Sequence, residues 1–208
     1  MGFALSWVAI KGKTRDAILG ELRLRPTGRR EEIPEAPLVG ASSADGWYLI
    51  VAQGDEQELL GPSVIERLAR GGEAVTCSVE EHVMYSEASG WRDGQRFWLV
   101  THAGEDGPKD VAATGALPAA YAAIRDRLLA QQQAAGGAKA EVDYLFDIPV
   151  DLAQSLVGFK HDQMHHAFEA QGFEELASTT KPPAKPKPPA PQKLGFEQKF
   201  SRWKARVK

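Results

Sequence analysis

Apolar residues fill two short stretches of the chain almost without interruption, at residues 2–10 and 46–52. Both stretches contain aromatic residues, and Gly or charged residues follow each of them. Short, nearly continuous apolar runs with such boundaries are typical of strands that expose little polar surface. We therefore expect a first strand at 2–10 and a central strand at 46–52.

A second pattern, the alternation of apolar and polar residues, runs through 74–85 and 95–102. Residues 89–94 separate the two stretches and include Asp93-Gly94, a frequent pair in tight turns. We expect these stretches to pair as a hairpin, and a third short strand at 109–114. Alternation would give the first of them one polar face, typical of a solvated sheet surface, made of Thr76, Ser78, Glu80 and His82.

Helix signals occur in four places. Thr14 and three prolines stand where helices commonly begin, and glycine pairs at 71–72 and 136–137 stand where they commonly end. The predicted helices cover 14–22, 61–69, 118–135 and 149–157. Residues 25–45 contain three prolines and a mixed run of charges, and we expect them to form a long surface loop.

This order of elements places most strands before residue 115 and most helices after it. The pattern predicts an α+β fold, a single domain in which helices pack on an antiparallel or mixed sheet. We expect this domain to span residues 1–177, followed by a Pro- and Lys-rich extended linker at 178–193 and a basic amphipathic helix at 194–208.

Charge divides the chain in the same place. The 208 residues include 25 Lys and Arg and 28 Asp and Glu, for a formal charge of −3. From Ser178 to the end nine residues are basic and one, Glu197, is acidic, so this tail carries +8. The first 177 residues hold 16 basic and 27 acidic groups and carry −11. Such an asymmetry concerns binding partners rather than the fold.

The tail has its own pattern. Residues 181–193 resemble a polyproline spacer that could extend on the order of 40 Å. Beyond it, apolar residues recur at helical spacing among basic ones, with Phe196, Phe200, Trp203 and Arg202 as the residues expected to dock. The tail could dock on the acidic body or on a second copy, lie on an anionic membrane surface, or bind nucleic acid. The charge of the body disfavours nucleic-acid binding by the whole molecule. An unfolded, solubilising tail is the alternative.

The sequence predicts a cytoplasmic protein without a transmembrane span. No apolar run approaches the about 20 residues that cross a bilayer. The apolar N-terminal stretch lacks the basic start of a signal peptide. Cys77 is the single cysteine, inside a predicted strand, and is expected to be a buried structural thiol.

The densest group of metal-ligating side chains lies at residues 161–166. In a helix, His161 and His165 would share one face, a spacing that suits zinc or another divalent metal. The glutamate of the metalloprotease pattern His-Glu-x-x-His is replaced by Asp162, and no third ligand is indicated. Solvated histidines beside a helix end are the alternative interpretation.

Two further groups are candidates for binding. Glu80, His82 and Tyr85 lie on the predicted polar strand, and the hairpin could bring His82 and His102 near Glu80 or Glu81. Trp91 and Arg92 lie at the predicted hairpin tip, and Trp and Arg are frequent anchors of interfaces. A tryptophan folded back over the sheet is the alternative. No nucleotide-binding glycine motif occurs, and no catalytic constellation is complete.

Three segments carry a resemblance to known proteins: Glu80-Glu81-His82-Val83-Met84-Tyr85, Gly90-Trp91-Arg92-Asp93-Gly94 and Asp147-Ile148-Pro149-Val150-Asp151-Leu152-Ala153. With them, most of residues 1–162 resembles an uncharacterised family of small bacterial cytosolic α+β proteins. The resemblance implies a free-standing bacterial domain and brings no activity, cofactor or catalytic residue.

Three hypotheses of function follow. The first is a non-enzymatic protein-binding module, such as an inhibitor or immunity-type protein, whose acidic body covers a basic partner. The second is a metal-dependent hydrolase that uses His161 and His165. The third is an adaptor that the C-terminal helix tethers to an anionic membrane or to a partner.

Overall fold

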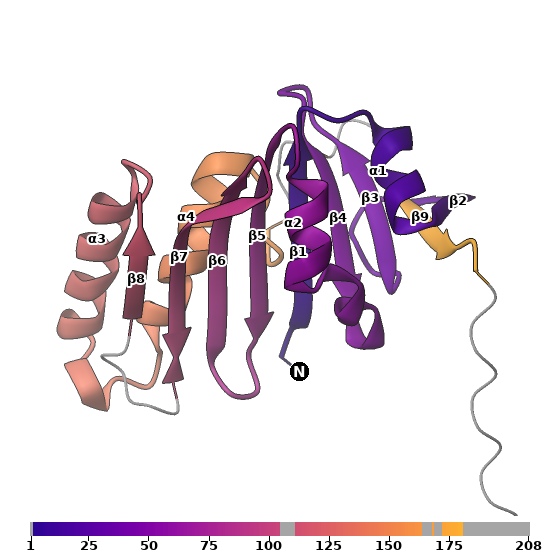
Figure 1. Ribbon diagram of the computed structural model, residues 1–208. Helices are drawn as coiled ribbons and strands as arrows, with labels where there is room; N and C mark the ends of the chain where they lie inside the picture. The colour runs from indigo at the N-terminus through magenta and orange to yellow at the C-terminus, as the bar shows by residue number, and fades with distance from the viewer. Residues whose placement is uncertain (1, 105–110, 164–167, 169–171, 181–208) are drawn as a thin grey trace, which may run out of the picture.

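A single sheet of nine strands organises the described part of the chain (Figure 1). The computed structural model describes residues 2–104, 111–163, 168 and 172–180. The strands are β1 Ala4–Lys11, β2 Leu24–Glu31, β3 Leu38–Ser42, β4 Tyr48–Gln53, β5 Glu73–Glu80, β6 Tyr85–Arg92, β7 Gln95–Ala103, β8 Val111–Gly115 and β9 Phe173–Ser178. Their order is β2-β9-β3-β4-β1-β5-β6-β7-β8, and all neighbours are antiparallel. The predicted α+β class with an antiparallel sheet is therefore confirmed.

Helices cover both faces of this sheet. On one side lie α1 Arg15–Leu22, α2 Pro62–Leu68 and the 3-10 helix η1 Gly54–Leu60; on the other lie α3 Tyr121–Ala134, α4 Asp147–Val157 and the short 3-10 helices η3 Gly137–Lys139 and η4 Tyr144–Phe146 (Figure 1). The side chain of Thr14 caps α1, and Pro62 opens α2, as the sequence predicts. Among the described residues, no helix combines the length and apolarity needed to cross a bilayer.

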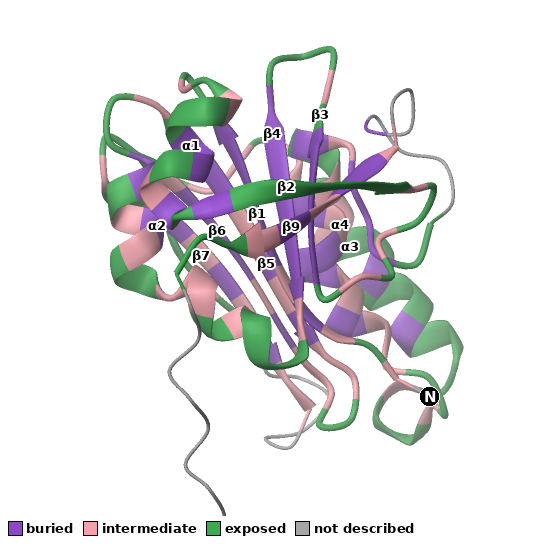
Figure 2. Cartoon of the chain, turned by 90° about the vertical axis from the view of Figure 1, so that its right-hand side faces the viewer, coloured by how far each residue is buried: buried purple, intermediate pink, exposed green. Residues whose placement is uncertain are grey.

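The central strand β1 explains why helices are needed on both sides. Leu5 and Trp7 point into the core under α4, whereas Val8 and Ile10 point into the core under α1 and α2. All four side chains are buried, and the buried positions of neighbouring strands continue both layers (Figure 2). The continuous apolar run at the N-terminus thus forms a central strand. The predicted central strand at 46–52 is confirmed as β4, and Cys77 is buried on β5 as expected.

Residues 25–45 were expected to form a loop, and this prediction is wrong. They contain β2 and β3: β3 pairs directly with β4, and β9 lies between β3 and β2. The strand β2 is an edge strand that is mostly exposed (Figure 2), so its composition is polar, and its register shifts between Pro26 and Arg30. An edge strand tolerates proline because one of its sides has no partner strand. The sequence pattern did not predict β9 either.

The predicted hairpin is also corrected. The stretch 74–85 does not pair with 95–102; instead, β5 ends at Glu80, the chain turns, and β6 runs back over Tyr85–Arg92 to separate β5 from β7. The small residues of β6, including Gly90, resemble a turn in the sequence. In the sheet Gly90 is required because a Cβ there would overlap the indole of Trp98.

A partly buried ion pair links β9 to α1. The Arg15 guanidinium donates two hydrogen bonds of 2.6 Å to the Glu174 carboxylate, and the Tyr48 hydroxyl donates a third of 2.9 Å. The hydrogen bond from Arg15 is the main cause that holds the pKa of Glu174 below its usual value, and burial raises the pKa of Tyr48. Three elements distant in sequence, α1, β4 and β9, therefore meet at one carboxylate.

We expect Glu174→Gln to lower the free energy of unfolding by about 1–3 kcal/mol, because it weakens the charge-assisted hydrogen bonds to Arg15 and to the buried Tyr48. Urea denaturation measures the change. Asp16→Asn removes the exposed partner of Arg15 and should cost less than about 1 kcal/mol. Equal losses in the two variants would contradict the role of Glu174.

The ion pair also makes stability depend on pH. Because the pKa of Glu174 is lowered in the folded protein, its contribution to stability is present above the unfolded-state pKa and is lost as the pH falls through the folded-state pKa.

Candidate functional site

A cavity of about 520 Å³ opens at one end of the sheet, on the side of α4. Its walls come from the start of the chain, the turn between β5 and β6, the segment that leads into α4 and the segment that follows α4. The lining residues are Gly2, Glu81, His82, Met84, Glu141, Val142, Asp143, Phe146, Asp147, His161 and Asp162. Five of them are carboxylates and, among the described residues, no Lys or Arg lines it. We call it the acidic cavity.

The first wall follows from strand register. Ala4 of β1 lies opposite Glu80 of β5, so the residue before β1 meets the residue after β5. The backbone N–H of Phe3 donates to the Glu81 carboxylate at 2.9 Å, and the Glu81 N–H donates to the Phe3 carbonyl at 2.9 Å. This pair holds the Glu81 carboxylate at the cavity.

The turn between β5 and β6 forms the second wall. His82, predicted to lie on a strand, stands in this turn, and its ring Nδ1 lies 2.7 Å from Oε1 of Glu80. Glu80 and His82 are thus brought together as predicted, but at a strand end. The polar run 80–82 explains the correction, because three consecutive polar residues do not fit the buried face of a sheet.

His161 forms the deepest part of the cavity. Its side chain is 2% exposed, its Nε2 lies 3.6 Å from Oε1 of Glu81, and the Phe3 ring meets its ring edge-on at 4.9 Å between centroids. Burial is the main cause that lowers the pKa of His161; Asp162 and Glu81 oppose the shift and Lys160 adds to it. The imidazole is therefore neutral at pH 7.

The other nitrogen of this ring, Nδ1, is buried and has no hydrogen-bond partner. Nε2 is the nitrogen on the side of the Glu81 carboxylate. Buried polar groups without a partner are rare. Because Nδ1 is shielded from solvent, the carboxylates rather than this ring supply the acceptors of the cavity.

Lys160 neutralises part of the charge from behind the wall. Its ammonium donates to Asp147 at 3.0 Å and to Asp151 at 2.9 Å. Burial lowers the pKa of Lys160, but the hydrogen bonds and charges of the two carboxylates outweigh burial and raise it. Lys160 therefore pairs mainly with α4, and its ammonium also lies 4.0 Å from Asp162. Among the described carboxylates of the cavity, Glu81, Glu141 and Asp143 form no ion pair with Lys160.

Asp143 joins the cavity to the sheet. One carboxylate oxygen caps η4 by accepting from the Leu145 N–H at 3.0 Å, and the other lies 2.9 Å from Nε2 of His102. His102 is buried on β7. The expectation that a hairpin brings His102 to Glu80 or Glu81 is wrong, because β6 lies between β5 and β7. The His102 imidazole pairs with Asp143 instead.

Three exposed apolar side chains belong to the segments that form this acidic cavity. Phe3 is 42% exposed, Val83 43% and Val142 55%. Phe3 contacts His161, Val142 lines the cavity, and Val83 lies between the lining residues His82 and Met84. These three are half of the large apolar side chains that are exposed in the described part of the chain, and we call them the apolar rim.

The predicted metal pair is not aligned by a helix. The helix α4 ends at Val157, Gly158 takes a left-handed conformation with φ of 82°, and His161 lies in a turn. His165 lies outside the described residues. Within the ranges that the structure describes, no group of three or more His, Cys, Asp and Glu side chains is arranged to hold a metal ion.

The remaining predicted binding residues lie elsewhere. Tyr85 donates its hydroxyl to Glu87 at 2.8 Å on the face opposite α4. Trp91 and Arg92 end β6, at the other end of the hairpin from Glu80. The Trp91 indole folds back to donate to Ser89 at 2.8 Å, and Arg92 pairs with Glu73 at 3.0 Å. Phe196, Phe200, Arg202 and Trp203 lie outside the described residues.

Sequence reasoning missed most carboxylates of the cavity. Glu141 and Asp143 come from the segment between α3 and α4, and Asp147 is the first residue of α4; the only signal there was the run of acidic residues at 141–151. Their meeting with Glu81 depends on long-range packing.

Comparison with known proteins identifies no relative: no family model, no curated protein and no solved structure matches the chain.

The pKa of His161 is lowered in the folded protein from its ordinary value of 6.5. Below about pH 6.5 the imidazole therefore binds a proton in the unfolded chain more readily than in the folded protein, and the protein is expected to lose stability. Urea denaturation between about pH 7.5 and 5 should show a steeper loss for the natural protein than for His161→Gln. His82→Gln, at an exposed imidazole, serves as the control and should follow the natural protein. Parallel curves for the natural protein and His161→Gln would contradict a buried neutral imidazole.

Proposed function

We propose that the protein is a binding module for a basic protein, and that the acidic cavity receives a Lys or Arg side chain of this partner. The observation that carries the proposal is the combination of five lining carboxylates with the apolar rim. Arg is a frequent anchor of interfaces, where it fills a pocket from which the surrounding contacts exclude water.

The hydrogen-bonding character of the cavity favours a cationic group. Glu141 and Asp162 are exposed at its edge, and their carboxylates are acceptors. Acceptors of this kind complement the several N–H donors of a guanidinium or an ammonium. A volume of about 520 Å³ lies within the usual range of binding pockets and has room for such a side chain.

The apolar rim favours a protein over a small cation. Phe3, Val83 and Val142 would remain exposed around a bound metal or polyamine, whereas the residues that flank a basic side chain in a protein could cover them. The charge of −11 on the first 177 residues would also accelerate the approach of a basic partner. An inhibitor or immunity-type protein in the bacterial cytoplasm is a function of this kind.

A basic peptide tests the proposal directly. The probe is a synthetic peptide of alternating Arg and Leu, and its matched control has Glu in place of Arg. The Arg peptide is expected to bind the full chain, the Glu peptide is not, and high salt should weaken the complex. Calorimetry measures both affinities. Equal binding of the two peptides, or no binding of either at low salt, would overturn the proposal.

Matched variants locate the site. Glu141→Gln combined with Asp162→Asn should weaken the Arg peptide about tenfold or more, through loss of charge-assisted hydrogen bonds. Asp45→Asn combined with Asp93→Asn changes the net charge equally, but at turns on the opposite end of the sheet, and should leave affinity within about twofold. Similar losses in both double variants would contradict a specific cavity and leave only general attraction.

The basic tail of the same chain is the competing occupant. Replacing Arg202, Lys204 and Arg206 with Gln in the full chain should leave the affinity for the Arg peptide nearly unchanged. An increase of about tenfold or more would assign the cavity to the tail and overturn the role of a separate partner.

A further inference from the structure

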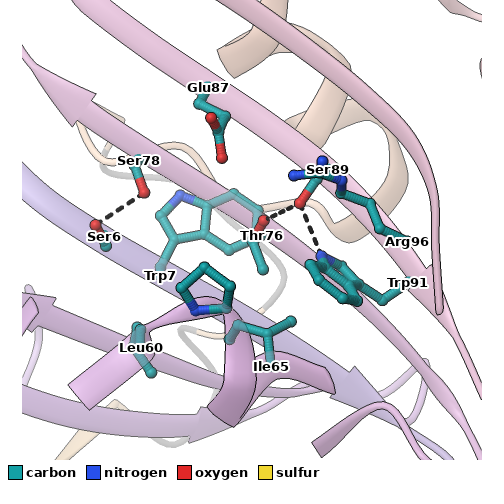
Figure 3. A pocket seen from close by; sticks show the side chains of 11 residues that line it. Ser6, Trp7, Leu60, Ile65, Thr76, Ser78, Glu87, Ser89, Trp91 and Arg96 are labelled. Carbon is teal, nitrogen blue, oxygen red and sulfur yellow. Dashed lines mark hydrogen bonds between the residues drawn. The ribbon is translucent and has the colours of Figure 1, made fainter. Parts of the chain in front are cut away.

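A second cavity lies on the opposite face of the sheet, beside α2 (Figure 3). The helices on this face cover the strands from β2 to β5, and the cavity opens where this layer ends and β6 and β7 are uncovered. Its volume is about 170 Å³. The floor is polar, with Ser6, Thr76, Ser78, Glu87 and Ser89, and Leu60, Pro62 and Ile65 form an apolar wall. We call it the hydroxyl cleft.

The hydroxyl groups form two hydrogen-bonded pairs, which differ in whether a proton is left to donate. Ser6 donates its proton to Gln57 at 3.0 Å, so in the 2.9 Å bond between Ser6 and Ser78 the donor is Ser78. The lone pairs of Ser78 then remain as acceptors. This first pair has used both of its protons and can only accept further hydrogen bonds.

The second pair keeps one proton. Ser89 accepts from the Trp91 indole N–H at 2.8 Å, and the bond of 2.6 Å between Thr76 and Ser89 uses one of their two hydroxyl protons. Whichever hydroxyl donates in that bond, the other proton has no acceptor among the described residues. The floor therefore presents a spare donor on one pair next to spare acceptors on the other.

Two charged groups of opposite sign complete the cleft. Glu87 accepts from the Tyr85 hydroxyl at 2.8 Å through Oε2, which leaves Oε1 as a strong acceptor. Arg96 lies over the Trp91 ring at 5.8 Å, and within the described part of the chain its guanidinium makes no hydrogen bond or ion pair. The paired signs make the cleft unsuitable for a strongly charged ligand and provide one more donor and one more acceptor.

From this arrangement we infer that the hydroxyl cleft binds one sugar ring, either a free monosaccharide or the end of an oligosaccharide. Each sugar hydroxyl both donates and accepts, so it matches a floor where donors and acceptors lie side by side. The wall of Leu60, Pro62 and Ile65 can cover the C–H face of the ring. The volume suits one ring, since it is smaller than the about 300 Å³ at which drug-sized pockets begin.

Nuclear magnetic resonance of the full chain tests this inference. The indole N–H signal of Trp91 is assigned by its loss in Trp91→Phe. Glucose, galactose, mannose and N-acetylglucosamine are added in turn, and so is a disaccharide made of two units of each. At least one of them is expected to shift this signal saturably. Binding of a disaccharide alone would support the site as one for a glycan end. If none of these sugars moves the signal, the inference is overturned.

Variants separate this site from the acidic cavity. Glu87→Gln and Ser78→Ala should each weaken the sugar about tenfold, since each removes an acceptor that a sugar hydroxyl needs. Glu141→Gln should leave sugar binding unchanged, and Glu87→Gln should leave binding of the Arg peptide unchanged. Circular dichroism checks that the variants fold. Folded Glu87→Gln and Ser78→Ala proteins that bind the sugar as the natural protein does would overturn the inference, whatever the peptide result.

Discussion

The packing of Phe159 is the contact on which the rest of the structure depends. Its ring is 1% exposed and meets Trp7 of β1, Phe173 of β9 and Phe168, with centroid distances of 5.6, 6.2 and 6.3 Å. Edge-on aromatic pairs of this kind each contribute about 0.5–1.5 kcal/mol beyond the burial of their area. One side chain thus links the central strand, the strand that is last in the sequence and the segment after α4.

The acidic cavity follows from this contact. Lys160 and His161 come directly after Phe159, so the burial of one ring places an ammonium under α4 and an imidazole beside Glu81. The lysine pairs with Asp147 and Asp151 of α4, and Glu81, Glu141 and Asp143 of the cavity lie outside these pairs. On the other face of the sheet, the layer of helices α1 and α2 ends at β5. The hydroxyl cleft opens beside this end. Both sites therefore lie where the cover of the sheet ends.

The sequence predicted those parts of the molecule whose burial is local and continuous. The apolar runs at β1 and β4 and the caps of α1 and α2 are visible without the fold. Edge strand β2 and the Ser- and Gly-containing β6 were missed, because their character depends on which strands lie beside them. Glu80 and His82 could be singled out from the sequence. Asp143 and Glu141 could not, because only the packing of the α3–α4 connection brings them to Glu81.

Mapping where the peptide of alternating Arg and Leu binds shows whether the acidic cavity receives a basic side chain. In a heteronuclear titration of the full chain, we expect amide shifts to concentrate at residues 2–3, 81–84, 141–147 and 161–163. The His161 ring signals should move with the same saturation curve. Saturable shifts confined to another part of the sheet, with the His161 ring unchanged, would contradict it.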